Sequence, residues 1–172
     1  MPRLIGQLLL TTLLAMLAGG CATRTAATDR LEFVVVRHAE KADDGSRDPP
    51  LSAAGEVRAR ALAAALDHAP LRAAYATAYR RTQATAAPAA RAHGVAVATY
   101  DANRAAADFV AQLRREHRDG TVLVVGHSNT VPAIAAALCD CQVAAMGDDE
   151  FDRLLTITID ADGHATLHEG RY

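Results

Sequence analysis

Two histidines of this chain lie directly after apolar runs and next to residues that suit an anion. Arg37 and His38 follow residues 31–36 in the segment FVVVRHAEK, and His127 follows the run TVLVV in the segment VVGHSNT. A lone histidine is most often structural, whereas a pair in such positions indicates a site. The helix expected after Gly126 adds free backbone N–H groups that suit an anion. These residues therefore predict a site for an anionic ligand or substrate.

The segments around these histidines alternate between apolar strands and alanine-rich helices. The last third differs, because RLLTITID and HATLHEGRY alternate around the turn DADG and predict a hairpin. Continuous apolar strands between helices favour a three-layer α/β/α sandwich with a mainly parallel sheet and a C-terminal antiparallel hairpin or edge strand. The expected strands before the hairpin are residues 31–36, 73–76, 95–100 and 121–125, and the expected helices are residues 52–69, 80–94, 103–120 and a further one after residue 126.

The expected sheet explains why the two histidines belong together. Ligands of parallel sheets bind at the carboxyl ends of the strands. His38 and His127, about 90 residues apart in sequence, would meet at one edge if their strands are parallel neighbours. Among the helix boundaries, Asn103 and Ser128 are expected to cap helices, and Pro88 is expected to kink or break one.

Composition limits the classes of function. The chain has 172 residues, of which 51% are hydrophobic, which suits one domain with a sizeable core. The net charge is −2 and only 4% of the residues are aromatic, so the chain has neither the basic surface nor the stacking residues expected of a nucleic-acid binder. Cys139 and Cys141 lie too close in sequence to form a disulfide easily, and free thiols and a bridge both stay open.

The N-terminal segment predicts export. Residues 1–20 hold an early Arg3, an apolar run and small residues before Cys21, which is the pattern of a secretory signal peptide. LAGGC also resembles a bacterial lipoprotein signal, with Ala18 where Leu is commoner. Ordinary cleavage or an uncleaved anchor are the alternatives. We expect Cys21 to be the lipidated N-terminus of a protein in the bacterial cell envelope, facing the periplasm or the exterior, with residues 21–30 as a tether and residues 31–172 as the domain.

Three motifs, VVVRHAEK, TAYRRTQATA and VVGHSNT, occur in that order. Together they resemble the histidine phosphatase superfamily, the phosphoglycerate-mutase-like fold, and especially its small uncapped members such as phosphohistidine phosphatases. The resemblance covers residue 31 to the C-terminus. It implies that His38 is a nucleophile that becomes phosphorylated, that Arg37 and Arg81 bind the phosphate, and that His127 is the second histidine of the site. Arg81 is selected over Arg80 because the family arginine lies four residues before the threonine that precedes alanine.

The chemistry explains the need for these residue types. A phosphoryl group in transfer spreads negative charge over three oxygens, which Arg37, Arg81 and His127 would stabilise. A neutral imidazole attacks phosphorus, and its phosphoramidate is hydrolysed in a second step. The nearby guanidinium groups favour the neutral form of His38. No metal or other cofactor is expected.

The proton donor for the leaving group is less clearly marked. Asp101 in TYDANR, about twenty residues after Arg81, is the first candidate, and Glu40 is the reserve. The loop GDDEFD offers Asp148, Asp149 and Glu150 as more distant candidates. A phosphohistidine substrate has a better leaving group and needs no dedicated acid.

We therefore predict a metal-independent phosphatase that acts on a phosphomonoester or a phosphohistidine, in a small molecule or a protein. A non-catalytic envelope lipoprotein that binds phosphorylated ligands is the alternative. A zinc site at His38, His127 and a carboxylate is disfavoured by the arginines, which would repel the cation. A mutase is less expected, because the chain has no long insertion to enclose an intermediate. Lys41 and Arg47 are taken as solvated surface charges, and the sequence does not indicate the oligomeric state.

Overall fold

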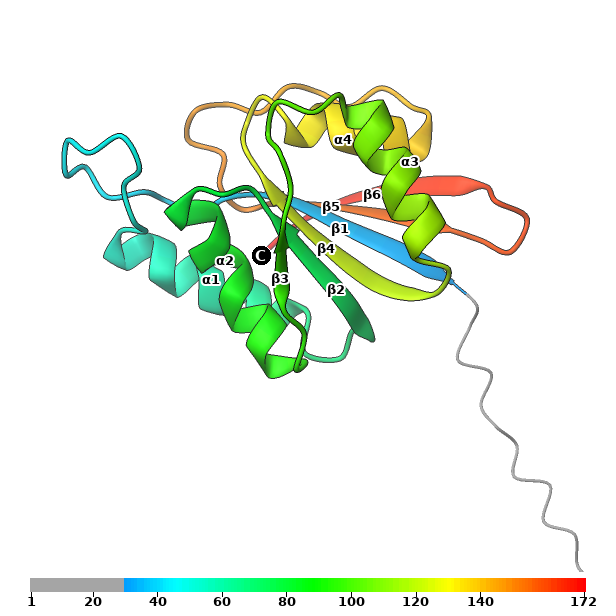
Figure 1. Ribbon diagram of the computed structural model, residues 1–172, viewed down its shortest axis with the longest axis horizontal. Coiled ribbons are helices and arrows are strands. Elements are labelled where there is room, and N and C mark those ends of the chain that lie inside the picture. The colour runs from blue at the N-terminus through cyan, green and yellow to red at the C-terminus, as the bar shows by residue number, and fades with distance from the viewer. Residues whose placement is uncertain (1–29) are drawn as a thin grey trace, which may run out of the picture.

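The computed structural model describes residues 30–172, which form a six-stranded sheet between two pairs of helices (Figure 1). The predicted signal peptide, Cys21 and all but the last residue of the predicted tether lie outside the described residues. Within residues 30–172, no helix has the length and apolar character needed to cross a membrane.

The sheet confirms the predicted mixture of parallel and antiparallel strands. Its order is β3-β2-β4-β1-β5-β6; β2 pairs in parallel with β3 and β4, and β1 pairs in parallel with β4. The last two strands are antiparallel and form the predicted hairpin at one edge. The strands are β1 (Leu31–Arg37), β2 (Leu71–Ala76), β3 (Val97–Thr99), β4 (Gly120–Gly126), β5 (Arg153–Ile159) and β6 (Ala165–Arg171).

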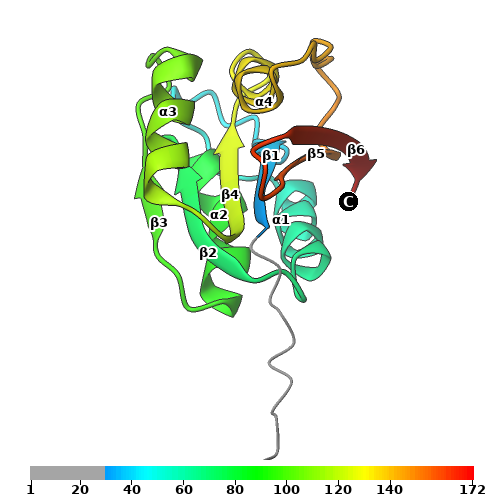
Figure 2. The same cartoon turned by 90° about the vertical axis from the view of Figure 1, so that its right-hand side faces the viewer.

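The helices cover both faces, as the sandwich requires (Figures 1 and 2). On β1, Phe33 and Val35 pack in the cluster that includes α3 and α4, whereas Val34 and Val36 pack in the cluster that includes α1 and α2. Full burial of such side chains stabilises the fold by roughly 1.5–3 kcal/mol each. The helices are α1 (Ala53–Ala65), α2 (Arg80–Ala92), α3 (Ala106–Glu116) and α4 (Val131–Cys139).

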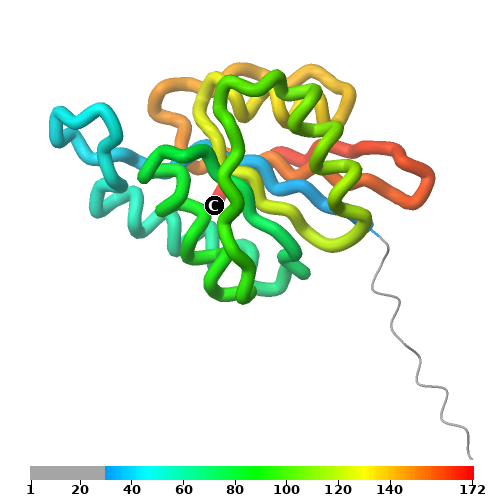
Figure 3. The backbone as a smooth tube through the Cα atoms, in the orientation of Figure 1, coloured from blue at the N-terminus to red at the C-terminus, as the bar shows by residue number. Residues whose placement is uncertain are grey.

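The register of β1 and β4 brings the two histidines to the same end of the sheet. Arg37 lies opposite Gly126, and the backbone N–H of His38 donates to the carbonyl of Gly126 over 2.9 Å. A side chain at Gly126 would come within 2.8 Å of the hydroxyls of Thr130 and Tyr100, so only glycine fits where β4 turns toward α4. Figure 3 shows the backbone of β1 and β4, which run side by side to this end of the sheet.

Two predicted helix caps are wrong, and so is a break at Pro88. Pro88 lies inside α2, which continues to Ala92 and keeps a buried face that includes Ala86 and Ala89. The alternative, a kink at Pro88, stays a prediction. Asn103 does not cap α3, because Asp101 accepts its backbone N–H in a turn that ends before the helix.

Ser128 does not cap α4 either. The backbone N–H groups of Thr130 and Val131 donate to the carbonyl of His127, which makes residues 127–130 a turn, and α4 begins only at Val131. Ser128 therefore lies within the turn and not at the cap.

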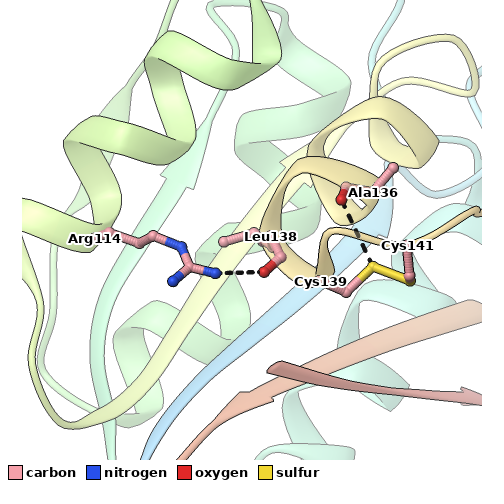
Figure 4. Close-up of a disulfide and its surroundings, with 5 residues drawn as sticks. All are labelled: Arg114, Ala136, Leu138, Cys139 and Cys141. Atoms are coloured by element: carbon pink, nitrogen blue, oxygen red, sulfur yellow. Dashed lines mark hydrogen bonds between the residues drawn. A yellow bond between two sulfur atoms is a disulfide. The ribbon is translucent and has the colours of Figure 1, made fainter. Parts of the chain in front are cut away.

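The two late cysteines form a disulfide at the C-terminal end of α4 (Figure 4). Asp140 between them adopts a left-handed conformation with φ of 50°, which reverses the chain after the helix. Arg114 of α3 donates to the carbonyl of Leu138 over 2.6 Å (Figure 4). Both contacts anchor the end of α4 that lies away from His127.

Candidate active site

A pocket of about 330 Å³ opens at the carboxyl ends of β1 and β4. Larger hollows elsewhere on residues 30–172 lack the two histidines that face one another here. The ring centroids of His38 and His127 are 5.3 Å apart in an edge-to-face arrangement. The pocket is lined by His38, Tyr79, Arg81, Ala102, Asn103, His127, Ser128, Asn129 and Thr130.

A hydrogen bond fixes one ring nitrogen of His38 and leaves the other nitrogen free. Its Nδ1 lies 2.8 Å from the carbonyl oxygen of Ala39, which only accepts, so Nδ1 carries the proton and Nε2 carries the lone pair. Burial lowers the pKa of His38 to about 4 against the opposing effect of the Ala39 bond, and the positive charge of Arg81 adds to the lowering. At neutral pH the side chain is therefore uncharged and presents a nucleophilic nitrogen.

Arg37 is fixed by a loop more than a hundred residues away in sequence. Its Nη1 donates to the carbonyls of Gly147 over 2.8 Å, Asp148 over 3.0 Å and Glu150 over 3.3 Å. The guanidinium lies 4.1 Å from the centroid of the Phe151 ring. Such a cation–π contact contributes about 0.5–2 kcal/mol. The loop 147–151 therefore orients Arg37 with backbone oxygens and one aromatic ring.

Arg81 approaches from the first turn of α2. Its guanidinium lies 4.4 Å from the centroid of the Tyr79 ring, and its Nη1 lies 3.6 Å from the Asp48 carboxylate. Within residues 30–172, the buried Nε atoms of Arg81 and Arg37 have no hydrogen-bond acceptor. A buried charged donor without an acceptor costs about 1–3 kcal/mol or more. Both arginines therefore retain a donor that is unpaired within this part of the chain; Arg81 lines the pocket, whereas Arg37 is not among its described lining residues.

His127 belongs to the turn between β4 and α4. Its Nε2 lies 3.0 Å from the hydroxyl of Thr77, and its backbone N–H donates to the hydroxyl of Thr130 over 3.0 Å. Burial, together with the charges of Arg81 and Arg37, lowers the pKa of His127 to about 4. Both histidines are thus neutral at pH 7 between two cations.

The first acid candidate lies beside the pocket without lining it. The Asp101 carboxylate accepts the backbone N–H of Asn103 over 2.9 Å, and Ala102 and Asn103 take the place at the pocket wall. The Asp101 carboxylate is therefore bonded within its own turn and is not part of the described pocket wall. Among the described pocket-lining residues there is no carboxylate.

The other acid candidates are engaged elsewhere. Glu40 accepts from Arg58 Nε and Nη2 at 2.6–2.9 Å, and these bonds hold its pKa below the usual range, so it is a poor proton donor at neutral pH. Glu150 faces Arg153 and Arg171 at 3.9 and 3.6 Å. Asp148 contributes its backbone carbonyl to Arg37. Asp149 is exposed and is not a lining residue of the described pocket.

The remaining candidates fall outside the pocket or argue against a metal. Lys41 and Arg47 are exposed, as expected for solvated charges. A zinc site would need a carboxylate beside the two histidines. The described residues that line the pocket include the cation Arg81, which would repel zinc, and no carboxylate. Asp160, Asp162 and His164, a cluster of metal-type ligands, lie exposed at the β5–β6 turn away from this pocket.

Four contributors to the site were not predicted: Thr77, Thr82, Tyr79 and Phe151. Thr77 and Tyr79 lie within a few residues of Arg81, but no local pattern shows that they face His127. Phe151 follows an acidic loop, and its contact with Arg37 depends on the tertiary fold. Only a structure or a set of related sequences could have identified these contacts.

One protein family matches part of the chain. The family model described as histidine phosphatase superfamily (branch 1) matches residues 33–105. No curated protein is significantly similar to the chain.

Among solved structures, the protein histidine phosphatase SixA complexed with tungstate is similar, with a TM-score of 0.65, 19% identity and coverage of 81% of this chain and 96% of that one. A mycobacterial glucosyl-3-phosphoglycerate phosphatase has a TM-score of 0.63 and 18% identity, with coverage of 80% of this chain and 97% of that one. A putative phosphohistidine phosphatase SixA from Nakamurella multipartitia has a TM-score of 0.59 and 22% identity, with coverage of 83% of this chain and 96% of that one. These likenesses support the shared fold.

Proposed function

We propose that the chain is a phosphatase of the histidine phosphatase superfamily, whose family model matches residues 33–105, and that it hydrolyses phosphohistidine or a phosphomonoester through a phospho-His38 intermediate. The observation that carries this proposal is the pair of buried arginine Nε donors beside a neutral histidine. Oxygens of a phosphoryl group would accept from Arg37 and Arg81 while its phosphorus faces Nε2 of His38.

The proposed reaction has two displacements. Nε2 of His38 attacks phosphorus while Nδ1 stays bonded to the Ala39 carbonyl, which keeps the ring in place. The two guanidinium groups stabilise the charge that spreads over the transferring oxygens. Water then attacks the phosphohistidine and releases phosphate, which regenerates His38.

The pocket favours a substrate with a good leaving group. The described lining has no carboxylate that could protonate a poor leaving alkoxide, and Asp101 bonds to its own turn. An imidazole that leaves from phosphohistidine needs less assistance than an alkoxide. We therefore rank phosphohistidine, in a protein or a small molecule, above simple alkyl phosphates.

Rapid-quench intact-mass spectrometry with an aryl phosphate tests the intermediate. The full-length chain should gain one acid-labile phosphoryl group before product accumulates, and His38→Ala should gain none. His68→Ala is the matched control, because the side chain of His68 is 99% exposed. Turnover that is unchanged in His38→Ala would refute the mechanism, and binding of the aryl phosphate without any turnover would support the non-catalytic alternative. Loss of activity with a chelator would favour the zinc site.

We also propose that the chain is exported and anchored in the bacterial cell envelope through a lipid on Cys21, because LAGGC follows an apolar leader. Growth with labelled fatty acid should label the wild-type chain and leave Cys21→Ser unlabelled. Cys141→Ser is the matched control for the loss of a cysteine. Absence of label on the wild-type chain would refute lipidation.

A further inference from the structure

A buried chain of two hydroxyl groups lies behind His127. The Thr77 hydroxyl lies 3.0 Å from Nε2 of His127 and 2.8 Å from the Thr82 hydroxyl. The Thr82 hydroxyl in turn lies 2.8 Å from the carbonyl oxygen of Tyr79 and 3.0 Å from that of Thr77. Both threonines are completely buried. These contacts connect the imidazole to backbone oxygens that do not exchange protons.

The chemistry of these groups determines which atom donates in each hydrogen bond between His127, Thr77 and Thr82. Carbonyl oxygens only accept, so the proton of the Thr82 hydroxyl points to them. The oxygen of Thr82 must then accept the proton of Thr77, which leaves Thr77 no proton for the ring. Nε2 of His127 is therefore the donor in its bond to Thr77. In the neutral ring, Nδ1 carries the lone pair.

Building on the proposed phospho-His38 mechanism, we propose that Thr77 and Thr82 hold His127 as the Nε2–H tautomer so that its Nδ1 carries the proton between the phosphoryl group and the leaving group. His127 lines the pocket, and its Nδ1 makes no hydrogen bond within residues 30–172. The other described lining residues, apart from the nucleophile His38, are Tyr79, Arg81 and side chains without a titratable group. Thr77 and Thr82 are positioning residues, because they act only through His127.

The proton balance of the two steps is complete. A substrate bound as its monoanion gives its phosphoryl proton to Nδ1 of His127, and the imidazolium returns that proton to the leaving atom as the bond to phosphorus breaks and the bond to Nε2 of His38 forms. Water then attacks phosphorus, the bond to His38 breaks, and the proton of the water passes to Nδ1 and on to the released phosphate. His127 ends each turnover neutral.

Thr82→Val gives the sharpest perturbation. Valine has the shape of threonine but cannot accept, so the Thr77 hydroxyl loses its acceptor and turns its proton to Nε2 of His127. We expect the ring to change to the Nδ1–H tautomer while its contact with Thr77 persists. Thr82→Ser keeps the acceptor and should restore the Nε2–H form. Thr121→Val is the matched control, because Thr121 is a buried threonine at the opposite end of β4.

Two-bond ¹H–¹⁵N correlation spectra of the full-length chain labelled at histidine read the tautomer directly, with His127→Asn to assign the signals. The wild type and Thr121→Val should show Nε2–H for His127, and Thr82→Val should show Nδ1–H. The kcat of Thr82→Val should fall about ten- to a hundredfold, because removing a residue that orients a functional histidine typically has an effect of this size. KM should change little, and Thr82→Ser should recover the kcat of the wild type. The inferred direction of these hydrogen bonds would be overturned if His127 were Nδ1–H in the wild type, or if it stayed Nε2–H in Thr82→Val.

A tautomer change without a fall in kcat would overturn the proton-carrying role alone. Failure of the wild type to form phospho-His38 would refute the proposed function, and that failure is recognised by the mass measurement and not by the spectra. The two proposals are therefore tested by separate readouts.

Discussion

Acidification from pH 7 to pH 5 should leave His38 neutral although an ordinary histidine would become charged. Burial and the charge of Arg81 lower the pKa of His38 to about 4. At pH 5 a histidine with that pKa is about 90% neutral, whereas one with the ordinary value of 6.5 is only about 3% neutral. The nucleophilic fraction should thus be about 30-fold larger at pH 5 than for an unperturbed histidine.

The same shift makes the fold sensitive to acid. The unfolded chain binds a proton at His38 near pH 6.5, whereas the folded chain does so only near pH 4. The contribution of this difference is present in full above about pH 6.5 and decreases as the pH falls toward 4. For His38 the full loss in the free energy of unfolding, reached below pH 4, is about 3 kcal/mol, and about 2 kcal/mol of it falls between pH 7 and pH 5.

An NMR titration of the imidazole protons measures the pKa values. His38 and His127 should titrate near pH 4. Urea unfolding at pH 7 and pH 5 measures the loss of stability. A midpoint near 6.5 for His38 would contradict the inference that burial and the two cations keep it neutral.

Three further predictions concern the surroundings of the site. Phe151→Leu removes the ring over Arg37 and should weaken the binding of inorganic phosphate about 2- to 30-fold, which corresponds to a cation–π contact of about 0.5–2 kcal/mol. Calorimetry measures this affinity, and an unchanged affinity would contradict a role for the ring. Asp101→Asn should change kcat for a simple alkyl phosphate, whose leaving group needs a proton, less than about threefold, and a loss of a hundredfold would identify Asp101 as the acid. Glu40→Gln should lower the free energy of unfolding by about 1 kcal/mol through its half-buried pair with Arg58 and leave kcat unchanged, whereas a large fall in kcat would identify Glu40 as the proton donor.

The sheet could be predicted from the sequence because the strands have a strong local signature. The continuous apolar runs at β1 and β4 are buried on both faces, and their parallel pairing follows from the helices between them. Helix boundaries were predicted less well. Asn103 and Ser128 are good capping residues by type, but hydrogen bonds within the preceding turns determine where α3 and α4 begin.

The centre of the site could be predicted as a juxtaposition, and its supporting contacts could not. His38, His127 and Arg81 lie at element ends that a parallel sheet brings together. The contacts of Arg37 with the loop 147–151 join residues 110 or more positions apart. Asp101 illustrates the limit most clearly, because its place in sequence suits an acid while a local turn occupies its carboxylate.

The site of phosphorylation tests the central claim most directly. The full-length chain, quenched in base after milliseconds with an aryl phosphate and digested at neutral pH, should yield one phosphopeptide whose fragment ions locate the phosphoryl group on His38. The Arg37 and Arg81 donors and the free Nε2 predict this position. A phosphoryl group on His127, or turnover without any phosphopeptide, would contradict the account.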